Sequence, residues 1–351
     1  MAFPHLKNLI DSLTARRLPW AEVSVCVGGT PVWGYAAGYS DPENGIPYEA
    51  GSRAMYYSLT KIVTALAAMK LTERGVLTLD TVLSDVLPEF SALRTPDGKT
   101  AKVTVKHLMS MSSGFSYDTK PFVNTRPTVS AREALRPLAS SVLAFTPGEH
   151  WLYGFGMDVL GAMMEEITGK KLSALFDETV FAPADIKGIR FLPALNDLSS
   201  LPSMFRTAGG SYVSAPLDTS CMPSPLAQSA GAGLTGNAEE FARLMSLTAG
   251  GGIIKEESLD LMTRDTLTDT SRPDCFWNSL KGYGYALGVR TLIDASASSS
   301  PLGECGWGGQ AGSYALIDRT RALGLCFLTH VIGQSETDLF RLIREALYAD
   351  L

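Results

Sequence analysis

Residues 56–61 read Tyr56-Tyr57-Ser58-Leu59-Thr60-Lys61 and lead directly into the segment IVTALAAMKLTERG, residues 62–75. The apolar residues Ile62, Ala65, Leu66 and Met69 follow one another at i, i+3, i+4 and i+7. This spacing predicts an amphipathic helix with one buried stripe, and Gly75 is a typical residue to end it.

Ser58 is expected where this helix begins, and Lys61 lies one turn further on, so the two side chains can share a face. A hydroxyl at a helix N-terminus beside an amine is a nucleophile with a possible base. Ser-x-x-Lys also occurs by chance, and the alternative interpretation is an N-cap serine with a surface lysine. Other parts of the chain have to decide between the two.

The composition is that of a globular chain large enough for one or two domains. Its 351 residues are 45% hydrophobic and 19% charged, with a net charge of −6. An acidic chain without a basic stripe argues against nucleic acid as a partner. We find no apolar run long enough to span a membrane and no signal peptide in the first residues. A cytoplasmic protein is therefore expected, with a removed signal peptide as the alternative.

The cysteines and histidines do not form a pattern of ligands. The cysteines are odd in number and lack a Cys-x-x-Cys pair, which favours reduced thiols over a disulfide framework. The histidines lack metal-ligand spacing, so we expect no metal site and no cofactor. The residues concerned are Cys26, Cys221, Cys275, Cys305 and Cys326, and His5, His107, His150 and His330.

Alternating and helical patterns divide the chain into three parts. In the first part, the pattern predicts a helix over residues 7–17 and a β-hairpin formed by residues 23–27 and 32–36. The middle part predicts helices over 105–111, 130–139, 155–168, 238–248 and 255–264, with long loops over 193–230. Ser130 and Glu133 form the pattern of a capping box. The last part predicts strands over 283–292, 312–318 and 323–330, and a closing helix over 336–347.

Strands at both ends and helices between them predict an α+β protein with one antiparallel sheet assembled from the two termini. We expect residues 1–80 and 275–351 to form the sheet domain and residues 81–274 a mainly helical domain. The active site is expected in the cleft between them.

Two further stretches carry candidate site residues. Tyr153 follows the Pro147-Gly148 turn and precedes a predicted helix, where a side chain can point into a cleft. Gly306-Trp307-Gly308-Gly309-Gln310-Ala311-Gly312 comes immediately before a predicted strand, where glycines often mark close approach of a ligand or of another backbone. The alternatives are an ordinary packed tyrosine and a glycine-rich turn.

The order and spacing of these three stretches resemble the serine β-lactamase and penicillin-binding-protein superfamily. The chain is most similar to its class C-like branch, and within that branch to the family VIII carboxylesterases. The similarity runs over nearly the whole chain, and includes the segments 103–114, 147–161, 231–241 and 282–285. It implies the β-lactamase/transpeptidase-like fold, with Ser58 as nucleophile, Lys61 as its partner and Tyr153 as the tyrosine of a Tyr-x-Asn motif.

Two departures from the superfamily's pattern bear on the substrate. Phe155 stands where Tyr-x-Asn has its asparagine, and Trp307-Gly308-Gly309 replaces a Lys-Thr-Gly or His-Thr-Gly element. Phe155 has no hydrogen-bonding group and the indole carries no charge, so an anionic β-lactam should bind poorly. The Trp-Gly-Gly element is associated with the esterases of this family. The sequence contains no Ser-Asp-Asn, which argues against a class A enzyme.

The resemblance implies acyl transfer through an acyl-serine, with the backbone N–H groups of Ser58 and Gln310 as the oxyanion hole. Lysine and tyrosine ordinarily titrate near about 10.4 and 10, so either needs a lowered pKa to act as a base. Burial lowers a lysine's pKa and raises a tyrosine's. The Trp307-Gly308-Gly309 element lacks the lysine or histidine that the superfamily's motif has at its first position. We therefore expect Lys61 and Tyr153 to share one proton as a coupled pair.

Aromatic residues near the motifs suggest an apolar acyl pocket, with core packing as the alternative explanation. The candidate substrate-binding residues are Tyr57, Trp151, Phe155, Trp307, Gly308 and Gly309, together with Tyr56 near the motif.

We expect a serine carboxylesterase acting on a small-molecule ester or amide, with a monomer and a homo-oligomer as alternative states. One alternative is an acyltransferase, D-amino-acid peptidase or weak β-lactamase on the same scaffold. The other is a non-catalytic penicillin-recognising protein. No Gly-x-Gly-x-x-Gly in the sequence follows a predicted strand, and this disfavours a Rossmann enzyme.

Overall fold

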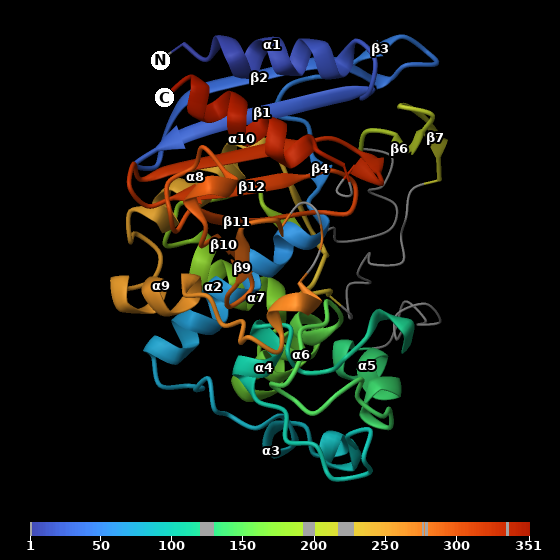
Figure 1. Cartoon of the computed structure of the whole chain (residues 1–351), viewed down its shortest axis with the longest axis vertical. Coiled ribbons are helices and arrows are strands. Elements are labelled where there is room, and N and C mark those ends of the chain that lie inside the picture. The colour runs from blue at the N-terminus through green and yellow to red at the C-terminus, as the bar shows by residue number, and fades with distance from the viewer. Residues whose placement is uncertain are drawn as a thin grey trace.

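An eight-stranded antiparallel sheet organises the structure, a computed structural model that describes residues 2–119, 130–191, 201–216, 228–275, 277, 280–334 and 337–351. The strand order is β3-β2-β1-β13-β12-β11-β10-β9, so strands from the start of the chain lie beside strands from its end (Figure 1). The strands are β1 (Trp20–Val27), β2 (Thr30–Asp41), β3 (Ile46–Pro47), β9 (Tyr283–Tyr285), β10 (Arg290–Leu292), β11 (Cys305–Gly308), β12 (Tyr314–Asp318) and β13 (Leu323–Leu328).

The pairing of β1 with β13 joins the two ends of the chain. Val25 lies opposite Leu325 in this pair, and β1 also forms the predicted hairpin with β2. β1 is buried almost throughout, whereas β2 is half exposed, because β1 has a strand on each side and helices on both faces. The predicted α+β fold with one sheet from both termini is confirmed.

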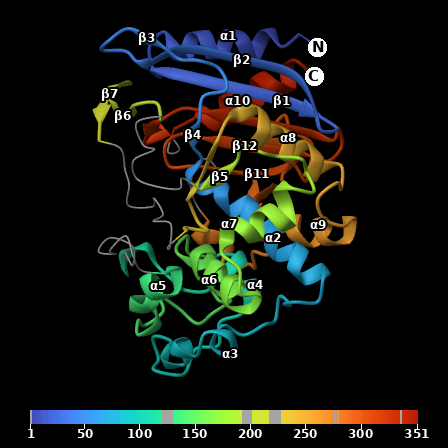
Figure 2. The same cartoon turned by 180° about the vertical axis from the view of Figure 1, so that it is seen from behind.

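Helices cover both faces of the sheet. The terminal helices α1 (Pro4–Thr14) and α10 (Leu339–Ala349) lie on one face, where Leu6, Ile10 and Ile343 join Leu325 in a buried cluster. Helix α8 (Ala238–Ala249) covers the other face, as the view from behind shows (Figure 2). Residues 238–249 therefore pack on the sheet although we expected them in the helical domain; the proposed division at residues 80 and 275 stays a prediction.

The remaining helices lie below the sheet in Figure 1. They are α2 (Thr60–Glu73), α3 (Leu83–Val86), α4 (Val105–Met109), α5 (Ala131–Ala139), α6 (Gly156–Thr168), α7 (Leu172–Phe176) with the π-helical turn η5 (Asp177–Phe181), and α9 (Glu256–Thr263). The short 3-10 turns are η1 (Tyr57–Leu59), η2 (Pro88–Ala92), η3 (Tyr117–Thr119), η7 (Arg272–Asp274) and η9 (Ala295–Ala297).

Helix α2 is buried on nearly every side, so the predicted single buried stripe is wrong. Lys61 and Thr64, which the periodicity placed off the stripe, are as buried as Leu66. The reason is that α2 contacts α6, α7, η5 and α9 around its circumference. The helix still ends as predicted, with Gly75 in the left-handed region at φ +70°.

Three of the predicted segments need correction. The strand predicted over 283–292 is two strands, β9 and β10, because Gly288 turns the chain at φ +86° and its N–H donates to the Met109 carbonyl at 2.9 Å. Trp307 lies within strand β11 rather than in a turn before a strand. The loops predicted over 193–230 contain the hairpin β6 (Met204–Ala208) and β7 (Ser211–Ala215); residues 192–200 and 217–227 lie outside the described residues.

Helix ends were predicted to within a few residues. Ser130 and Glu133 form the predicted capping box, with the Ser130 N–H donating to Glu133 Oε2 at 2.9 Å. α1 begins three residues before the predicted start, because Pro4 is accepted in the first turn of a helix. None of the described helices is long and apolar enough to cross a membrane. The four described cysteines are free thiols, and Cys221 lies outside the described residues.

Two small sheets hold the segment that precedes Ser58. One consists of β4 (Ala54–Met55), β8 (Leu234–Gly236) and β5 (Arg190–Phe191), and the other of β14 (Val331–Ile332), β6 and β7. The Met55 N–H donates to His330 Nε2 at 2.9 Å, and the other ring nitrogen of His330 bonds the Pro202 carbonyl at 3.1 Å. An accepting Nε2 requires the neutral imidazole.

We predict that His330 makes the fold sensitive to acid. Burial lowers the pKa of His330 to about 4, below the value near 6.5 of an unfolded chain. Unfolding therefore takes up a proton between these values, so stability is complete above pH ~6.5 and is lost as the pH falls toward about 4. Between pH ~7 and ~4.5 this site should remove about 2 to 3 kcal/mol from the free energy of unfolding. Urea unfolding of the wild type and His330→Asn measures the difference; equal losses in both would contradict it.

Candidate active site

Ser58 lies in the 3-10 turn η1, immediately before α2, rather than in the first turn of the α-helix itself. The preceding residue, Tyr57, has φ +47°, a left-handed conformation that is rare for a residue with a large side chain. This sharp change of direction leaves Ser58 half-buried at the head of the buried helix. Backbone strain of this kind often occurs at functional sites.

Lys61 lies beneath Ser58 and is 0% exposed. Its Nζ donates to Ser58 Oγ at 3.1 Å and to the Gly231 carbonyl at 2.8 Å. The same Nζ lies 4.8 Å from the centroid of the Tyr153 ring. The structure therefore brings Ser58, Lys61 and Tyr153 together, although Tyr153 is more than ninety residues away along the chain.

Tyr153 lies in the loop before α6 and its hydroxyl has a partner that the sequence did not reveal. Trp307 Nε1 donates to Tyr153 Oη at 2.8 Å, and the two rings are 5.3 Å apart. Because the Trp307-Gly308-Gly309 element carries no cation, we expected Lys61 to be the only partner of Tyr153 that the motifs provide. The indole N–H of Trp307 on strand β11 is a further partner of Tyr153, and it donates a hydrogen bond without adding a positive charge.

Two opposing effects act on the charge of Lys61. Burial lowers its pKa, but the oxygens of Tyr117 and Tyr153 and the carboxylate of Asp158 raise it more, so the pKa lies above the usual value of lysine. The effect of burial on the pKa of Lys61 is therefore outweighed by that of its neighbours. An ammonium group at this position donates hydrogen bonds and accepts none.

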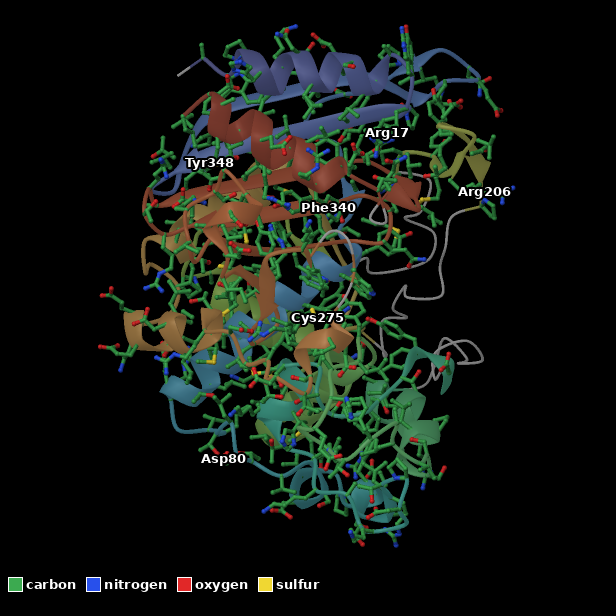
Figure 3. All side chains as sticks on the ribbon, viewed as in Figure 1. Arg17, Asp80, Arg206, Cys275, Phe340 and Tyr348 are labelled. Atoms are coloured by element: carbon green, nitrogen blue, oxygen red, sulfur yellow. The ribbon has the colours of Figure 1, made fainter. Side chains whose placement is uncertain are left out.

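The glycines after Trp307 allow two close approaches. A Cβ on Gly309 would lie 2.6 Å from the Tyr56 carbonyl oxygen, and Ser313 Oγ donates to that oxygen at 2.8 Å. The turn that follows β11 is therefore pressed against the turn that carries Ser58. Gly308 faces the other side of the sheet, where a Cβ would lie 2.2 Å from the Phe340 ring on α10 (Figure 3).

Gln310 occupies this turn with its side chain exposed. Its N–H forms no hydrogen bond with the described part of the chain. A free backbone donor beside the Ser58 turn is what an oxyanion hole requires.

Aromatic rings form a wall next to Tyr153. Trp307 packs edge-on against Tyr285 at 5.1 Å, and Trp151 contacts Tyr153 at 6.2 Å and Trp277 at 5.5 Å. Trp277 also lies 5.2 Å from Tyr153 and is 39% exposed. An open cavity of ≈ 800 Å³ adjoins this wall, and it is lined by Pro96, Asp97, Ala144, Phe145, Thr146, Glu149, His150, Trp151, Leu152, Tyr153, Asp274 and Trp277.

The other candidate substrate-binding residues lie at different depths. Phe155 is nearly buried and packs against the Tyr117 ring at 4.6 Å, whereas Tyr57 is buried in a small cluster with Met55 and Met204 behind the Ser58 turn. Tyr57 therefore supports the turn from below.

Sequence reasoning missed three residues of the site. The Tyr117 ring lies 5.7 Å from the Tyr153 ring, and Tyr117 acts electrostatically on Lys61. Trp277 completes the aromatic wall. Asp158 lies buried in the first turn of α6. Tyr117 and Trp277 lie outside the segments that carried the resemblance, and Asp158 lies within one of them, 147–161, without having been singled out. The acidic residue in an otherwise apolar stretch of α6 was the one visible signal, since buried carboxylates are rare without a partner.

The fold and this convergence of a hydroxyl, an amine and a phenol define a protein of the β-lactamase-like class. A family model described as Beta-lactamase matches residues 6–348, and the chain belongs to that family.

The relatives agree with this assignment. Esterase EstB of Burkholderia gladioli is 31% identical, over 97% of this chain and 93% of EstB. Among solved structures, EstCE1, a hydrolase with promiscuous acyltransferase activity, superposes with a TM-score of 0.86 at 23% identity, covering 98% of this chain and 97% of EstCE1. A mutant of simvastatin synthase LovD from Aspergillus terreus has a TM-score of 0.76 at 20% identity, covering 98% and 94% of the two chains. These two structures show the shared fold.

We predict that Trp307→Phe slows the reaction of Ser58 with p-nitrophenyl acetate. The variant retains an aromatic ring and loses the N–H that bonds Tyr153 Oη. A hydrogen bond to a charged group contributes about 1.5 to 3 kcal/mol, so a less populated phenolate base corresponds to about a 10- to 100-fold lower kcat/KM. The matched control is Trp277→Phe, which trims the same aromatic wall without touching that bond. Equal small effects of both substitutions would contradict the prediction.

Proposed function

We propose that the protein is a serine hydrolase that cleaves carboxylic esters through an acyl-serine intermediate. The observation that carries the proposal is the contact of Lys61 Nζ with Ser58 Oγ, together with Tyr153 beside the same ammonium. Esterase EstB, a relative that aligns over nearly the whole chain, supports the choice of ester substrates.

In the proposed mechanism the proton shared by Lys61 and Tyr153 lies on Lys61 before the reaction, so Tyr153 is the phenolate. Ser58 Oγ attacks the ester carbonyl, and the Tyr153 phenolate takes the hydroxyl proton. Lys61 favours this transfer because its ammonium donates to Ser58 Oγ and lies over the Tyr153 ring. Trp307 supports the phenolate that accepts the proton, because its indole N–H donates to the phenol oxygen. Lys61 and Tyr153 then act as one coupled pair that shares a proton. Tyr153 returns the proton to the leaving alcohol, and water deacylates Ser58 by the reverse path.

The backbone N–H groups of Ser58 and Gln310 are proposed to bind the oxyanion. The contacts of Gly309 and Ser313 with the Tyr56 carbonyl support this assignment, because they bring the two turns into contact. A pair of fixed donors of this kind lowers the barrier by several kcal/mol.

Neutral esters with an apolar or aromatic group are the proposed substrates. The cavity beside Tyr153 has the walls of Trp151 and Trp277, and its acidic lining residues are Asp97, Glu149 and Asp274. This lining and the uncharged indole of Trp307 oppose the carboxylate of a β-lactam. Poor turnover of β-lactams therefore follows from the same proposal.

Acyl transfer to an alcohol is the second candidate. The ≈ 800 Å³ cavity adjoins Tyr153, the proposed proton donor and acceptor, and can hold an acceptor alcohol beside it. A fluorophosphonate that failed to label Ser58 would favour the third possibility, a non-catalytic binding protein.

We predict turnover of p-nitrophenyl acetate and butyrate, with nitrocefin hydrolysed at least 100-fold more slowly in kcat/KM, about 2.7 kcal/mol in transition-state binding. Ser58→Ala should abolish all three reactions, because it removes the nucleophile while keeping the fold. Product analysis with added methanol separates the candidates, since a transferase diverts acid to methyl ester. Ester turnover that survives Ser58→Ala, or equal activity on nitrocefin, would refute the proposal.

A further inference from the structure

Asp158 is a buried carboxylate that the proposed mechanism does not use. It lies near the start of α6 and is 5% exposed. Ser229 Oγ donates to Asp158 Oδ1 at 2.7 Å, and the Gly231 N–H donates to the same oxygen at 3.0 Å. Two donors on one oxygen suit an ionised carboxylate, which only accepts hydrogen bonds.

The peptide segment 229–232 connects this carboxylate to Lys61. The Gly231 N–H bonds Asp158, whereas the Gly231 carbonyl accepts from Lys61 Nζ at 2.8 Å. A neighbouring carbonyl, that of Ala230, accepts from Thr64 Oγ1 at 2.6 Å, one turn along α2 from Lys61. The segment is thus bonded to α2 on one side and to α6 on the other, and these two helices contact one another.

The contact between Asp158 and this segment leaves no free space. A Cβ on Gly231 would lie 2.4 Å from Asp158 Oδ2, so residue 231 has to be glycine for the carboxylate to approach. Ser229 Oγ also accepts from the Ala232 N–H at 3.0 Å, which fixes the segment from within. The orientation of the Gly231 carbonyl toward Lys61 therefore depends on Asp158.

We propose that Asp158 is a positioning residue for the acyl-transfer reaction, which holds the 229–232 segment against Lys61 and supplies the negative charge that compensates its buried ammonium. The inference rests on the proposed function, because it assigns Asp158 a role through Lys61. Within the part of the chain that the structure describes, the hydrogen bonds of the Asp158 carboxylate come from Ser229 and Gly231, and Asp158 does not line the cavity beside Tyr153.

The charges around this pair come from three elements. Tyr117 of η3, Tyr153 of the loop before α6 and Asp158 of α6 act on Lys61, and Lys61 is the charged group that acts on Asp158. Burial raises the pKa of Asp158, and Lys61 and the two hydrogen bonds limit the rise. A buried charge is expensive without an opposite charge, so Asp158 and Lys61 each make the other's ionisation less costly.

The experiment compares Asp158→Asn with the wild type in the pH profile of kcat/KM for p-nitrophenyl acetate. Asparagine keeps the shape and an accepting oxygen but loses the charge. The acid limb of this profile reports protonation of the coupled Lys61–Tyr153 pair. Removing a nearby negative charge favours loss of that proton, so the acid limb should move to lower pH by about one pH unit. We expect kcat to fall at least tenfold, with a much smaller change in KM.

Two other variants separate charge from packing. Ser229→Ala removes one hydrogen bond and keeps the carboxylate, so it should lower kcat without moving the acid limb. Glu166→Gln removes a charge from the exposed face of the same helix, where Glu166 bonds Arg132, and should leave the profile unchanged. An Asp158→Asn profile with the wild-type acid limb, whatever its rate, would overturn the proposal. If that variant does not fold, wild-type kcat in Ser229→Ala overturns it.

A second readout does not require turnover. Heteronuclear NMR of the labelled lysine ammonium follows the titration of Lys61 directly, and its midpoint should fall in Asp158→Asn. A wild type that hydrolyses no ester, with a Lys61 midpoint that still depends on Asp158, refutes the proposed function alone. An unchanged midpoint refutes the role of Asp158 alone.

Discussion

The burial of the Lys61 ammonium is the constraint on which the site depends. A charge with no access to water costs several kcal/mol unless its surroundings replace the lost hydration. Here the Gly231 carbonyl and Ser58 Oγ accept hydrogen bonds from the ammonium, and the Asp158 carboxylate supplies the opposite charge within the same core. Each of these groups is itself fixed by a neighbouring element, so α2, α6 and the 229–232 segment have to pack correctly for Lys61 to be placed at all.

The sheet contributes the other half of the site. Strand β11 presents Trp307 to one face and lets Gly308 pack against Phe340 on the other, as the alternation of a strand requires. The turn after β11 then contacts the turn of Ser58 at a distance that no side chain on Gly309 would allow. The helical elements thus position the amine and the phenol, and the sheet positions the indole and the backbone donors.

The indole of Trp307 gives the site a hydrogen-bond donor at this position and no positive charge. Trp307 Nε1 still donates a hydrogen bond to Tyr153 Oη, so the phenol stays oriented. The positive charge that would attract a carboxylate is absent from this position, and acidic residues lie along the adjoining cavity. An uncharged donor at this position is the basis on which neutral esters are proposed as substrates.

Local spacing in the sequence determined the hairpin of β1 and β2 and the capping box of Ser130 and Glu133. It also determined the short distance from Ser58, in the turn η1, to Lys61 in the first turn of α2. The position of Tyr153 followed from the resemblance to a family. Tertiary structure alone decided that α2 is buried on nearly every side, that Gly288 splits β9 from β10, and that Trp307 and Asp158 meet the site. Periodicity reports one face of one element, whereas these features depend on contacts between residues far apart in the chain. The groups that raise the pKa of Lys61 against the effect of burial also come from such contacts.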